Sequence, residues 1–340
     1  MSETLTPVRF GLVGAGAIAQ AYAQAFASSE QVQLAAVADC RIEAAEALAE
    51  TASAASFSSV ESMVEEMDLE AVIVCTPPVT HDEVCDVLFA RGINVLCEKP
   101  LAVDSETAAR MAASAKEADV IFTMASKFRY VADVAQAKSI IASGVLGEVV
   151  LFENIFTGRV DMTQRWNSDP SVSGGGVLID NGTHSVDITR YFLGELVDIQ
   201  AMEGHRIQEL PVEDTAKMFV RSRSGVLASI DLSWSVSKEL PYFIAVYGSA
   251  GTLLVGWQES KYRRSGDSDW TVFGSGYQKV AAFQRQLENF AGAVRGTESL
   301  LVEPADALAS VSVIEAAYRS LAKGDWEPIV EVSAKKASAI

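Results

Sequence analysis

Residues 10–19 read FGLVGAGAIA, an apolar run that leads directly into the pattern Gly14-x-Gly16-x-x-Ala19. The pattern predicts a strand, a tight turn and a helix, because Gly14 permits the turn and Ala19 lets the helix pack closely on the strand. Gly16 allows the backbone to approach a pyrophosphate, which would lie at the positive N-terminus of the helix. The stretch therefore predicts a dinucleotide-binding turn.

An acidic residue follows this turn at the distance that dinucleotide sites require. Asp39 ends the apolar run at residues 34–38, about 20 residues after the turn. Its carboxylate would accept hydrogen bonds from both hydroxyls of the adenosine ribose and repel a 2′-phosphate, which favours NAD. Arg41 leaves NADP open, since a guanidinium can bind that phosphate. The first helical N–H groups, at Ala17 and Ile18, would bind the pyrophosphate. The alternative is a glycine turn that is only structural.

Length and composition bound the class of protein. The 340 residues suffice for about two domains, and 49% apolar with 21% charged residues is ordinary for a globular chain. The net charge of -18 disfavours nucleic-acid partners, which select for clustered Lys and Arg. No apolar stretch reaches the roughly 18 residues of a membrane span and no secretory leader is recognised, so we expect a cytoplasmic protein without membrane association. The four cysteines lack C-x-x-C spacing, so we predict neither a metal site nor a disulfide framework.

The sequence pattern changes character after about residue 124. Before this point, short β-rich runs alternate with helical periodicity, which predicts a doubly wound parallel α/β sheet of the Rossmann type. Beyond it, turn residues separate longer β-rich runs, which predict an antiparallel sheet in an α+β domain. We expect an NAD(P)-binding domain over residues 1–127 and a substrate-binding and oligomerisation domain over residues 128–340. The strands expected in the second domain are 149–158, 214–221, 225–236, 241–247 and 251–256.

The first strand of the second domain has apolar residues on both sides of residues 148–156. If helices cover only one face of an antiparallel sheet, the other apolar face needs a different cover. We therefore expect a homo-oligomer that uses this sheet as its interface.

Polar residues follow the predicted strand at 71–75. Two prolines stiffen the loop that begins with Thr76 and Pro77, so that the loop can lie along a cofactor at the carboxyl edge of the sheet. His81 would begin the next helix, near the ribose or the nicotinamide. A capping or surface role for this histidine is the alternative.

Glu98 and Lys99 end the next predicted strand, with Pro100 directly behind them. Because the proline prevents the lysine from swinging freely into solvent, its ammonium would stay beside the cofactor and could share or donate a proton. We assign Glu98 and Lys99 to cofactor binding and Lys99 also to catalysis. The alternative is an ordinary surface pair of Glu and Lys.

Three glycines at 174–176 precede a predicted helix that carries Asp180 and His184. At a spacing of four, the two side chains share one side of the helix. A carboxylate one turn from an imidazole can orient it and bind a substrate hydroxyl, while the imidazole titrates near neutral pH. We interpret the glycines as a loop that approaches a ligand and the pair as catalytic. The alternative is an intrahelical pair that only stabilises its helix.

Taken in order, these motifs resemble the glucose–fructose oxidoreductase, inositol dehydrogenase and MocA-type (Gfo/Idh/MocA) oxidoreductases over essentially the whole chain. The matching residues are Gly14-x-Gly16-x-x-Ala19, Glu98-Lys99-Pro100, and Gly174-Gly175-Gly176 followed by Asp180-x-Gly182-x-His184-x-x-Asp187. The resemblance implies NAD(P)-linked oxidation or reduction of a sugar, cyclitol or related polyol. It also implies a large, open, mostly antiparallel C-terminal sheet that forms homodimer or homotetramer contacts. The catalytic set that it implies is Lys99, Asp180 and His184.

Substrate contacts are expected from the same lysine, aspartate and histidine and from three further residues. Arg159 and Trp166 lie in the segment 157–167, which the resemblance implies is a variable substrate loop, and Arg129 and Arg159 could bind an acidic substrate group. Two other functions stay open. One is a glycoside hydrolase of the same fold that uses held NAD to oxidise its sugar transiently. The other is a non-enzymatic NAD(P)-binding sensor, although a sensor has no need of proton-transfer groups.

Overall fold

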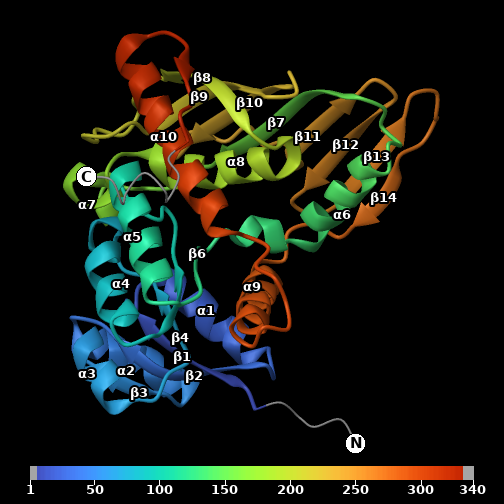
Figure 1. Ribbon diagram of the computed structural model, residues 1–340. Coiled ribbons are helices and arrows are strands. Elements are labelled where there is room, and N and C mark those ends of the chain that lie inside the picture. Colours follow the sequence, from blue (N-terminus) through green and yellow to red (C-terminus); the bar gives the residue numbers. More distant parts are fainter. Residues whose placement is uncertain (1–5, 332–340) are drawn as a thin grey trace, which may run out of the picture. The chain divides into compact units, whose positions relative to one another are not determined.

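The computed structural model describes residues 6–331 (Figure 1). These residues form two compact units, which are described separately below. Of the described residues, the first unit contains 6–127 and 279–308, and the second contains 128–278 and 309–331.

Six parallel strands form the sheet of the first unit, in the order β3-β2-β1-β4-β5-β6. The order reverses between β1 and β4, and sheets of this kind bind ligands at the reversal, outside the carboxyl ends of the strands. The predicted doubly wound sheet is therefore confirmed. The strands are β1 (Val8–Val13), β2 (Val32–Ala38), β3 (Ala55–Phe57), β4 (Ala71–Val74), β5 (Asn94–Cys97) and β6 (Phe122–Met124).

Helices pack around this sheet, so its strands are apolar almost throughout; all four residues of β4 are buried. The Asp104 side chain caps α5 by accepting the N–H of Thr107 over 2.7 Å. The helices are α1 (Ala17–Ala27), α2 (Ile42–Ala52), α3 (Val60–Glu66), α4 (His81–Phe89), α5 (Ser105–Glu117) and α9 (Lys279–Val294), with the 3₁₀ turn η1 (Pro78–Thr80) before α4.

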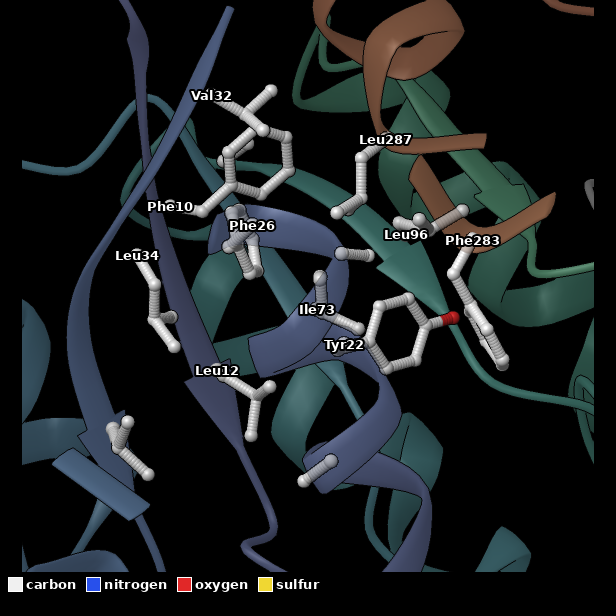
Figure 2. Close-up of a cluster of buried hydrophobic side chains, with 14 of the residues drawn as sticks. Phe10, Leu12, Tyr22, Phe26, Val32, Leu34, Ile73, Leu96, Phe283 and Leu287 are labelled. Atoms are coloured by element: carbon white, nitrogen blue, oxygen red, sulfur yellow. The ribbon is translucent and has the colours of Figure 1, made fainter. Parts of the chain in front are cut away.

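The core of the first unit gathers aromatic rings from β1, α1 and α9 (Figure 2). Phe10 packs edge-on against Phe26 at 5.4 Å between centroids, and Tyr22 packs edge-on against Phe283 at 4.6 Å. Figure 2 shows Leu287 in the same cluster, one turn after Phe283. Edge-to-face pairs of this kind add to the stabilisation that burial alone provides.

Helix α9 departs from the expected division of the chain. We expected everything after residue 127 to belong to the second domain, but residues 279–308 return to the first unit. The physical reason is the apolar face of α9, where Phe283, Leu287 and Phe290 are buried in the core that contains Phe10 and Tyr22. The periodicity of a helix identifies such a face but not the surface that it covers.

Nine strands form the sheet of the second unit, in the order β14-β13-β12-β11-β7-β10-β9-β8-β15. Only β7 and β10 pair in parallel and the other neighbours are antiparallel, which confirms a large, mostly antiparallel sheet. The strands are β7 (Val149–Thr157), β8 (Leu196–Glu203), β9 (Thr215–Ser222), β10 (Leu227–Ser233), β11 (Tyr242–Gly248), β12 (Gly251–Gly256), β13 (Ser260–Arg264), β14 (Thr271–Gly274) and β15 (Glu327–Pro328).

Helix α8 packs on one face of this sheet, against β7, β9 and β10 (Figure 1). Gly182 permits the close approach, because a Cβ there would lie 3.2 Å from the Leu232 side chain and 3.7 Å from that of Met218. On the opposite face, Leu151 and Leu227 are partners in the β7–β10 register and are 45% and 50% exposed. The other helices are α6 (Ala132–Ala142), α7 (Pro170–Ser173), α8 (Val177–Leu193) and α10 (Pro304–Lys323), with the 3₁₀ turns η2 (Lys127–Tyr130) and η3 (Trp166–Ser168); α10 and η2 each begin in the first unit.

Several simple features of residues 6–331 bear on function. No helix among them combines the length and the apolar character of a bilayer span. The four cysteines are free thiols. Within the same residues, no group of three or more His, Cys, Asp or Glu side chains is placed to hold a metal ion.

Candidate functional site

The glycine turn after β1 is built against the end of β4. Gly14 has a φ of +97°, and a Cβ at this position would lie 2.8 Å from the carbonyl carbon and oxygen of Cys75. Its N–H donates to the Ala38 carbonyl over 2.8 Å, which ties the turn to the end of β2. Only glycine meets both the backbone angle and the contact.

Gly16 differs from Gly14 in having open space around it. It is the N-cap of α1, its φ is -76°, and a Cβ there would meet no described atom within 4 Å. No side chain of the described residues caps this end of the helix, so the N–H groups of Ala17 and Ile18 face the space above it. An open helix N-terminus with room for backbone approach fits the pyrophosphate of a dinucleotide.

The Asp39 carboxylate is held by backbone N–H groups, one of them from the glycine turn after β1. One carboxylate oxygen accepts the N–H of Ala15 over 2.7 Å, and the other accepts the N–H of Arg41 over 2.9 Å. The Arg41 guanidinium lies 3.6 Å from the second oxygen, but its side chain is 71% exposed whereas that of Asp39 is 9% exposed. The carboxylate is thus fixed before any ribose arrives, while the arginine stays near it at the surface.

His81 begins α4 in the first unit, and its side chain is fully buried there. Its Nε2 lies 2.9 Å from the Thr76 carbonyl oxygen and its Nδ1 lies 3.1 Å from that of Leu101. Burial lowers the pKa of the ring, against the effect of these two carbonyls. The surface role considered for His81 is wrong, and its ring nitrogens face protein carbonyls. The ring joins the loop after β4 to the loop after β5.

The tip of β5 carries a buried carboxylate. Glu98 accepts the hydroxyl of Tyr22 over 2.9 Å with one oxygen and the N–H of Lys99 over 3.0 Å with the other. The Lys99–Pro100 peptide bond is cis. Lys99 itself is partly exposed. The interpretation of Glu98 and Lys99 as an ordinary surface pair is therefore wrong for Glu98, which is buried.

Two hydroxyls near these strand ends make no hydrogen bond with described residues. They are the side-chain oxygens of Thr76, after β4, and Ser126, after β6, and both are buried. Pro77 follows Thr76 in extended backbone and is the N-cap residue of the turn η1. Buried polar atoms without partners are rare in folded proteins, so each is a candidate contact for a ligand at the carboxyl edge of the sheet. Together with the space at Gly16, they fit a bound dinucleotide.

In the second unit, Asp180 and His184 lie one turn apart near the start of α8. Both side chains are partly exposed, whereas most residues around them on this helix are buried. The ring of His184 meets the ring of Phe128 edge-on, with 5.1 Å between centroids. A carboxylate and an imidazole that both reach solvent on a packed helix can serve a substrate.

Glu213 fixes the beginning of that helix, and sequence reasoning missed it. One of its carboxylate oxygens accepts the N–H groups of Gly176 and Leu178, each over 3.0 Å, and the hydroxyl of Tyr318 over 2.9 Å. Burial raises the pKa of this carboxyl, against the effect of these donors. A carboxylate at the positive end of α8 is a favourable cap and holds the turn that carries Asp180.

The three glycines before α8 serve internal packing, which corrects their interpretation as a ligand-approach loop. A Cβ at Gly175 would overlap the hydroxyl of Tyr318, and one at Gly176 would overlap the backbone oxygen of Glu213. Gly174 ends α7 with a φ of +80°. Side-chain bulk is excluded here because the chain packs against its own residues.

Arg129 is a second correction to the expected site, since its guanidinium is buried and already paired with Asp187. Its Nε lies 3.0 and 3.1 Å from the two oxygens of Asp187, and a terminal nitrogen lies 2.7 Å from one of them. The two side chains are only 5% and 2% exposed. A buried guanidinium requires such a carboxylate partner. Arg159 and Trp166, the other expected substrate contacts of this kind, are exposed.

Aromatic rings beside His184 form a cluster that sequence reasoning also missed. Phe128 stacks on Tyr277 at 5.3 Å and packs against Phe156 at 4.8 Å. Tyr277 in turn meets Trp257 at 5.8 Å, and Trp257 lines a pocket of about 530 Å³ between residues 239–242 and 257–261. Rings beside His184 provide an apolar surface of the kind that packs against the C–H groups of a ligand.

The expected catalytic set is divided between the two units. Lys99 belongs to the first unit, and Asp180 and His184 belong to the second. Their convergence on one substrate oxygen stays a prediction.

Comparison with known proteins gives two family matches. Residues 8–126 match the oxidoreductase family with an NAD-binding Rossmann fold, and residues 134–254 match the GFO/IDH/MocA C-terminal domain. The chain is 29% identical over 341 residues to the rhizopine catabolism protein MocA of Rhizobium meliloti, which covers 94% of this chain and 96% of that protein. It is 30% identical over 254 residues to a 1,5-anhydro-D-fructose reductase of Ensifer adhaerens, with 72% and 75% covered.

The fold matches solved structures over nearly its full length. A levoglucosan dehydrogenase in complex with NADH superposes with a TM-score of 0.89 at 21% identity, and the match covers 96% of this chain and 100% of that one. At this identity the likeness establishes the fold alone. It agrees with a Rossmann unit followed by a large open sheet.

Proposed function

The chain belongs to the Gfo/Idh/MocA family of NAD-binding oxidoreductases, and from this premise we propose that it transfers a hydride between nicotinamide and a secondary alcohol or ketone carbon of a sugar, cyclitol or related polyol. The observation that carries the proposal is the pair on α8, where a carboxylate and an imidazole reach solvent one turn apart. The name of one relative, a 1,5-anhydro-D-fructose reductase, supports a sugar-derived substrate.

NAD supplies the hydride acceptor when it is bound, and the side chains supply position and proton transfer. In the oxidation direction, His184 takes the proton of the substrate hydroxyl while the hydride leaves the carbon that bears this hydroxyl. The alcohol thereby becomes a ketone. Lys99 donates a hydrogen bond to that oxygen and stabilises the negative charge that develops on it. Asp180 orients the imidazole and the substrate. Reduction runs through the same groups in reverse.

The cofactor preference follows from Asp39. Its carboxylate is fixed by two backbone N–H groups; it would accept the ribose hydroxyls, while a 2′-phosphate would meet a negative charge. We therefore propose NAD over NADP, with Arg41 as the residue that limits the preference. Titration with both cofactors tests this, and tighter NADP binding would contradict it.

Substrate contacts come from the second unit in this proposal. Arg159 and Trp166 are exposed near the end of β7 and could bind the far side of a polyol. The ring of Phe128 beside His184 provides an apolar contact close to the reacting carbon. Arg129 is left out, because Asp187 already pairs with it.

A panel of polyols, cyclitols, sugars and sugar acids tests the proposed reaction. The purified chain is mixed with NAD and each compound, and NADH is followed by absorbance; the reverse direction uses NADH and the ketones. Reaction with one or a few compounds is the expected outcome. If no compound in the panel gives a net change in NADH, and an aglycone is released from a glycoside at constant NADH, the proposal is refuted in favour of the hydrolase.

We also propose that the open face of the second sheet forms a homodimer or homotetramer interface. Its exposed apolar residues include Leu151 and Leu227, which are register partners on β7 and β10. Charged residues lie beside them, so this face is amphipathic rather than purely apolar; Lys217 pairs with Asp231 over 2.9 Å. Sedimentation at micromolar concentration tests the proposal, and a single species of 36.3 kDa would refute it.

The location of the enzyme is proposed as the cytoplasm, because NAD-linked turnover draws on a pool of that cofactor. Cell fractionation with an antibody to the chain tests it. Recovery in a fraction outside the cytoplasm would refute the proposal.

A further inference from the structure

A chain of hydrogen bonds buried in the first unit leads to the backbone of Lys99. Gln286 on α9 donates from Nε2 to the hydroxyl oxygen of Tyr22 over 3.0 Å. Tyr22 on α1 donates to Glu98 over 2.9 Å, and the other Glu98 oxygen accepts the N–H of Lys99 over 3.0 Å. We propose that Tyr22 and Gln286 are positioning residues, which act through Glu98 to hold Lys99 where it serves the reaction. The inference rests on the proposed role of Lys99.

The direction of the chain is fixed by the chemistry of its members. Burial and the neighbouring Glu98 carboxylate raise the pKa of Tyr22, so its hydroxyl stays protonated and acts as a donor. Both oxygens of Glu98 receive donors, from Tyr22 and from Lys99. Because the Tyr22 proton is given to Glu98, the amide of Gln286 must present its NH₂ group to the phenolic oxygen. The donor and acceptor roles in each hydrogen bond thereby determine those in the next.

The chain is rigid because its members are buried and packed. Tyr22 is 0% exposed, Gln286 is 1% exposed and Glu98 is 8% exposed. The ring of Tyr22 packs edge-on against Phe283, which precedes Gln286 by one turn of α9, at 4.6 Å between centroids (Figure 2). In a low-dielectric interior these bonds are strong and polarise one another.

An apolar core would not need this polar chain. Phenylalanine at residue 22 would fill the same space, and leucine or methionine at 286 would match the apolar face of α9. The present arrangement even leaves Oε1 of Gln286 buried without a hydrogen bond to described residues. Burying these polar groups is less favourable than an apolar core would be. What they provide in return is a fixed Glu98 carboxylate at the strand tip before Lys99.

A purely structural chain would matter for folding but not for the chemistry, and the two roles are separable. Tyr22→Phe keeps the packed ring and removes the donor to Glu98. We expect kcat to fall by about tenfold or more, because small displacements of a catalytic group lower rates steeply, while KM for NAD changes less than about twofold. The pH profile of kcat should shift as well, since the carboxylate that accepts the backbone N–H of Lys99 loses its Tyr22 donor. Measurements use the polyol that the panel identifies.

Tyr247→Phe is the matched control. Its hydroxyl also donates to a carboxylate, that of Glu153 over 3.1 Å, but on the sheet of the second unit. This variant should keep the kcat and the pH profile of the parent chain.

Gln286→Met provides a second variant that keeps helix propensity and volume. If the chain acts as a unit, the double variant with Tyr22→Phe should lose no more kcat than Tyr22→Phe alone. Should Tyr22→Phe fail to fold, a lowered kcat with a shifted pH profile in Gln286→Met supports the inference and a normal kcat and profile overturns it.

Two results overturn the inference on their own. One is a normal kcat and an unchanged pH profile in Tyr22→Phe while Lys99→Ala is inactive. The other is independent, multiplicative losses in the double variant. If Lys99→Ala keeps normal turnover, the proposed function of Lys99 fails instead, so the two failures are distinguishable.

Discussion

The carboxylate of Asp39 accepts the backbone N–H of Ala15 over 2.7 Å, inside the glycine turn itself. The acid that we assign to the ribose therefore also fixes the loop that we assign to the pyrophosphate. We therefore expect this one bond to couple the binding of the two halves of the dinucleotide.

Replacement of Asp39 tests the coupling. Asp39→Ala leaves the N–H groups of Ala15 and Arg41 without their acceptor, so stability should fall by about 1–3 kcal/mol and NAD affinity by about tenfold or more. Asp39→Asn keeps one acceptor oxygen and removes the charge, so the ratio of NADP to NAD affinity should rise. Thermal melts and fluorescence titrations with both cofactors measure these effects. Unchanged NAD affinity in Asp39→Ala would contradict the assignment.

Two glycines of similar appearance should respond in opposite ways to alanine. At Gly16 a Cβ enters open space at a normal φ, so Gly16→Ala should fold with a stability within about 1 kcal/mol of the parent and bind NAD poorly. At Gly176 a Cβ overlaps the backbone of Glu213, so Gly176→Ala should destabilise the chain by about 3 kcal/mol or fail to fold. Urea denaturation of the apo chains compares the pair. Equal losses of stability would contradict the different roles.

Local chemistry made part of this molecule predictable. The turn at residues 10–19 and the acid at Asp39 are consecutive parts of one β-α-β unit, so spacing alone placed them at the carboxyl edge of a parallel sheet. The exposed side of α8 at Asp180 and His184 follows in the same way from helical periodicity.

Features that depend on distant segments were not predictable. Gly175 and Gly176 face Tyr318 and Glu213, which come from remote parts of the chain, and no local pattern distinguishes such packing from approach to a ligand. Helix α9 has an ordinary amphipathic pattern, which does not indicate the surface that its apolar face packs against. Strand β13, at Ser260–Arg264, is so polar that it lacks the alternation of a half-buried strand.

Removal of the proposed proton-transfer groups should abolish turnover and spare the cofactor. Lys99→Ala and His184→Ala are each expected to lower kcat by about 10²–10⁴-fold, with NAD affinity close to that of the parent. Lys116→Ala and His205→Ala are matched controls at exposed positions and should keep normal rates. Steady-state kinetics and NADH titration measure both quantities. Near-normal kcat in either Lys99→Ala or His184→Ala would remove that residue from the mechanism.

Arg129 should behave as a structural residue in spite of its expected role at the substrate. Arg129→Ala leaves the Asp187 carboxylate buried without this partner, which should lower stability by about 3–5 kcal/mol. Arg159→Ala changes an exposed arginine and should leave stability within about 0.5 kcal/mol while raising KM for the polyol. Urea denaturation and kinetics compare the two variants. A stable Arg129→Ala with only a raised KM would restore the original assignment.

The buried ring of His81 should make the stability of the chain depend on pH. Burial lowers its pKa from the ordinary value of 6.5, so the folded chain favours the neutral ring. As the pH falls through about 6.5, the unfolded chain binds a proton that the folded chain resists, and the free energy of unfolding falls with it.

His81→Gln removes the titrating group, although it also loses one link between the loops that carry Thr76 and Leu101. Its stability should be lower than that of the parent at about pH 8, and the difference should shrink toward about pH 5. Urea denaturation at several pH values measures the two curves, with the exposed His205→Gln expected to follow the parent. Parallel curves for the parent and His81→Gln would show that this histidine does not set the pH dependence.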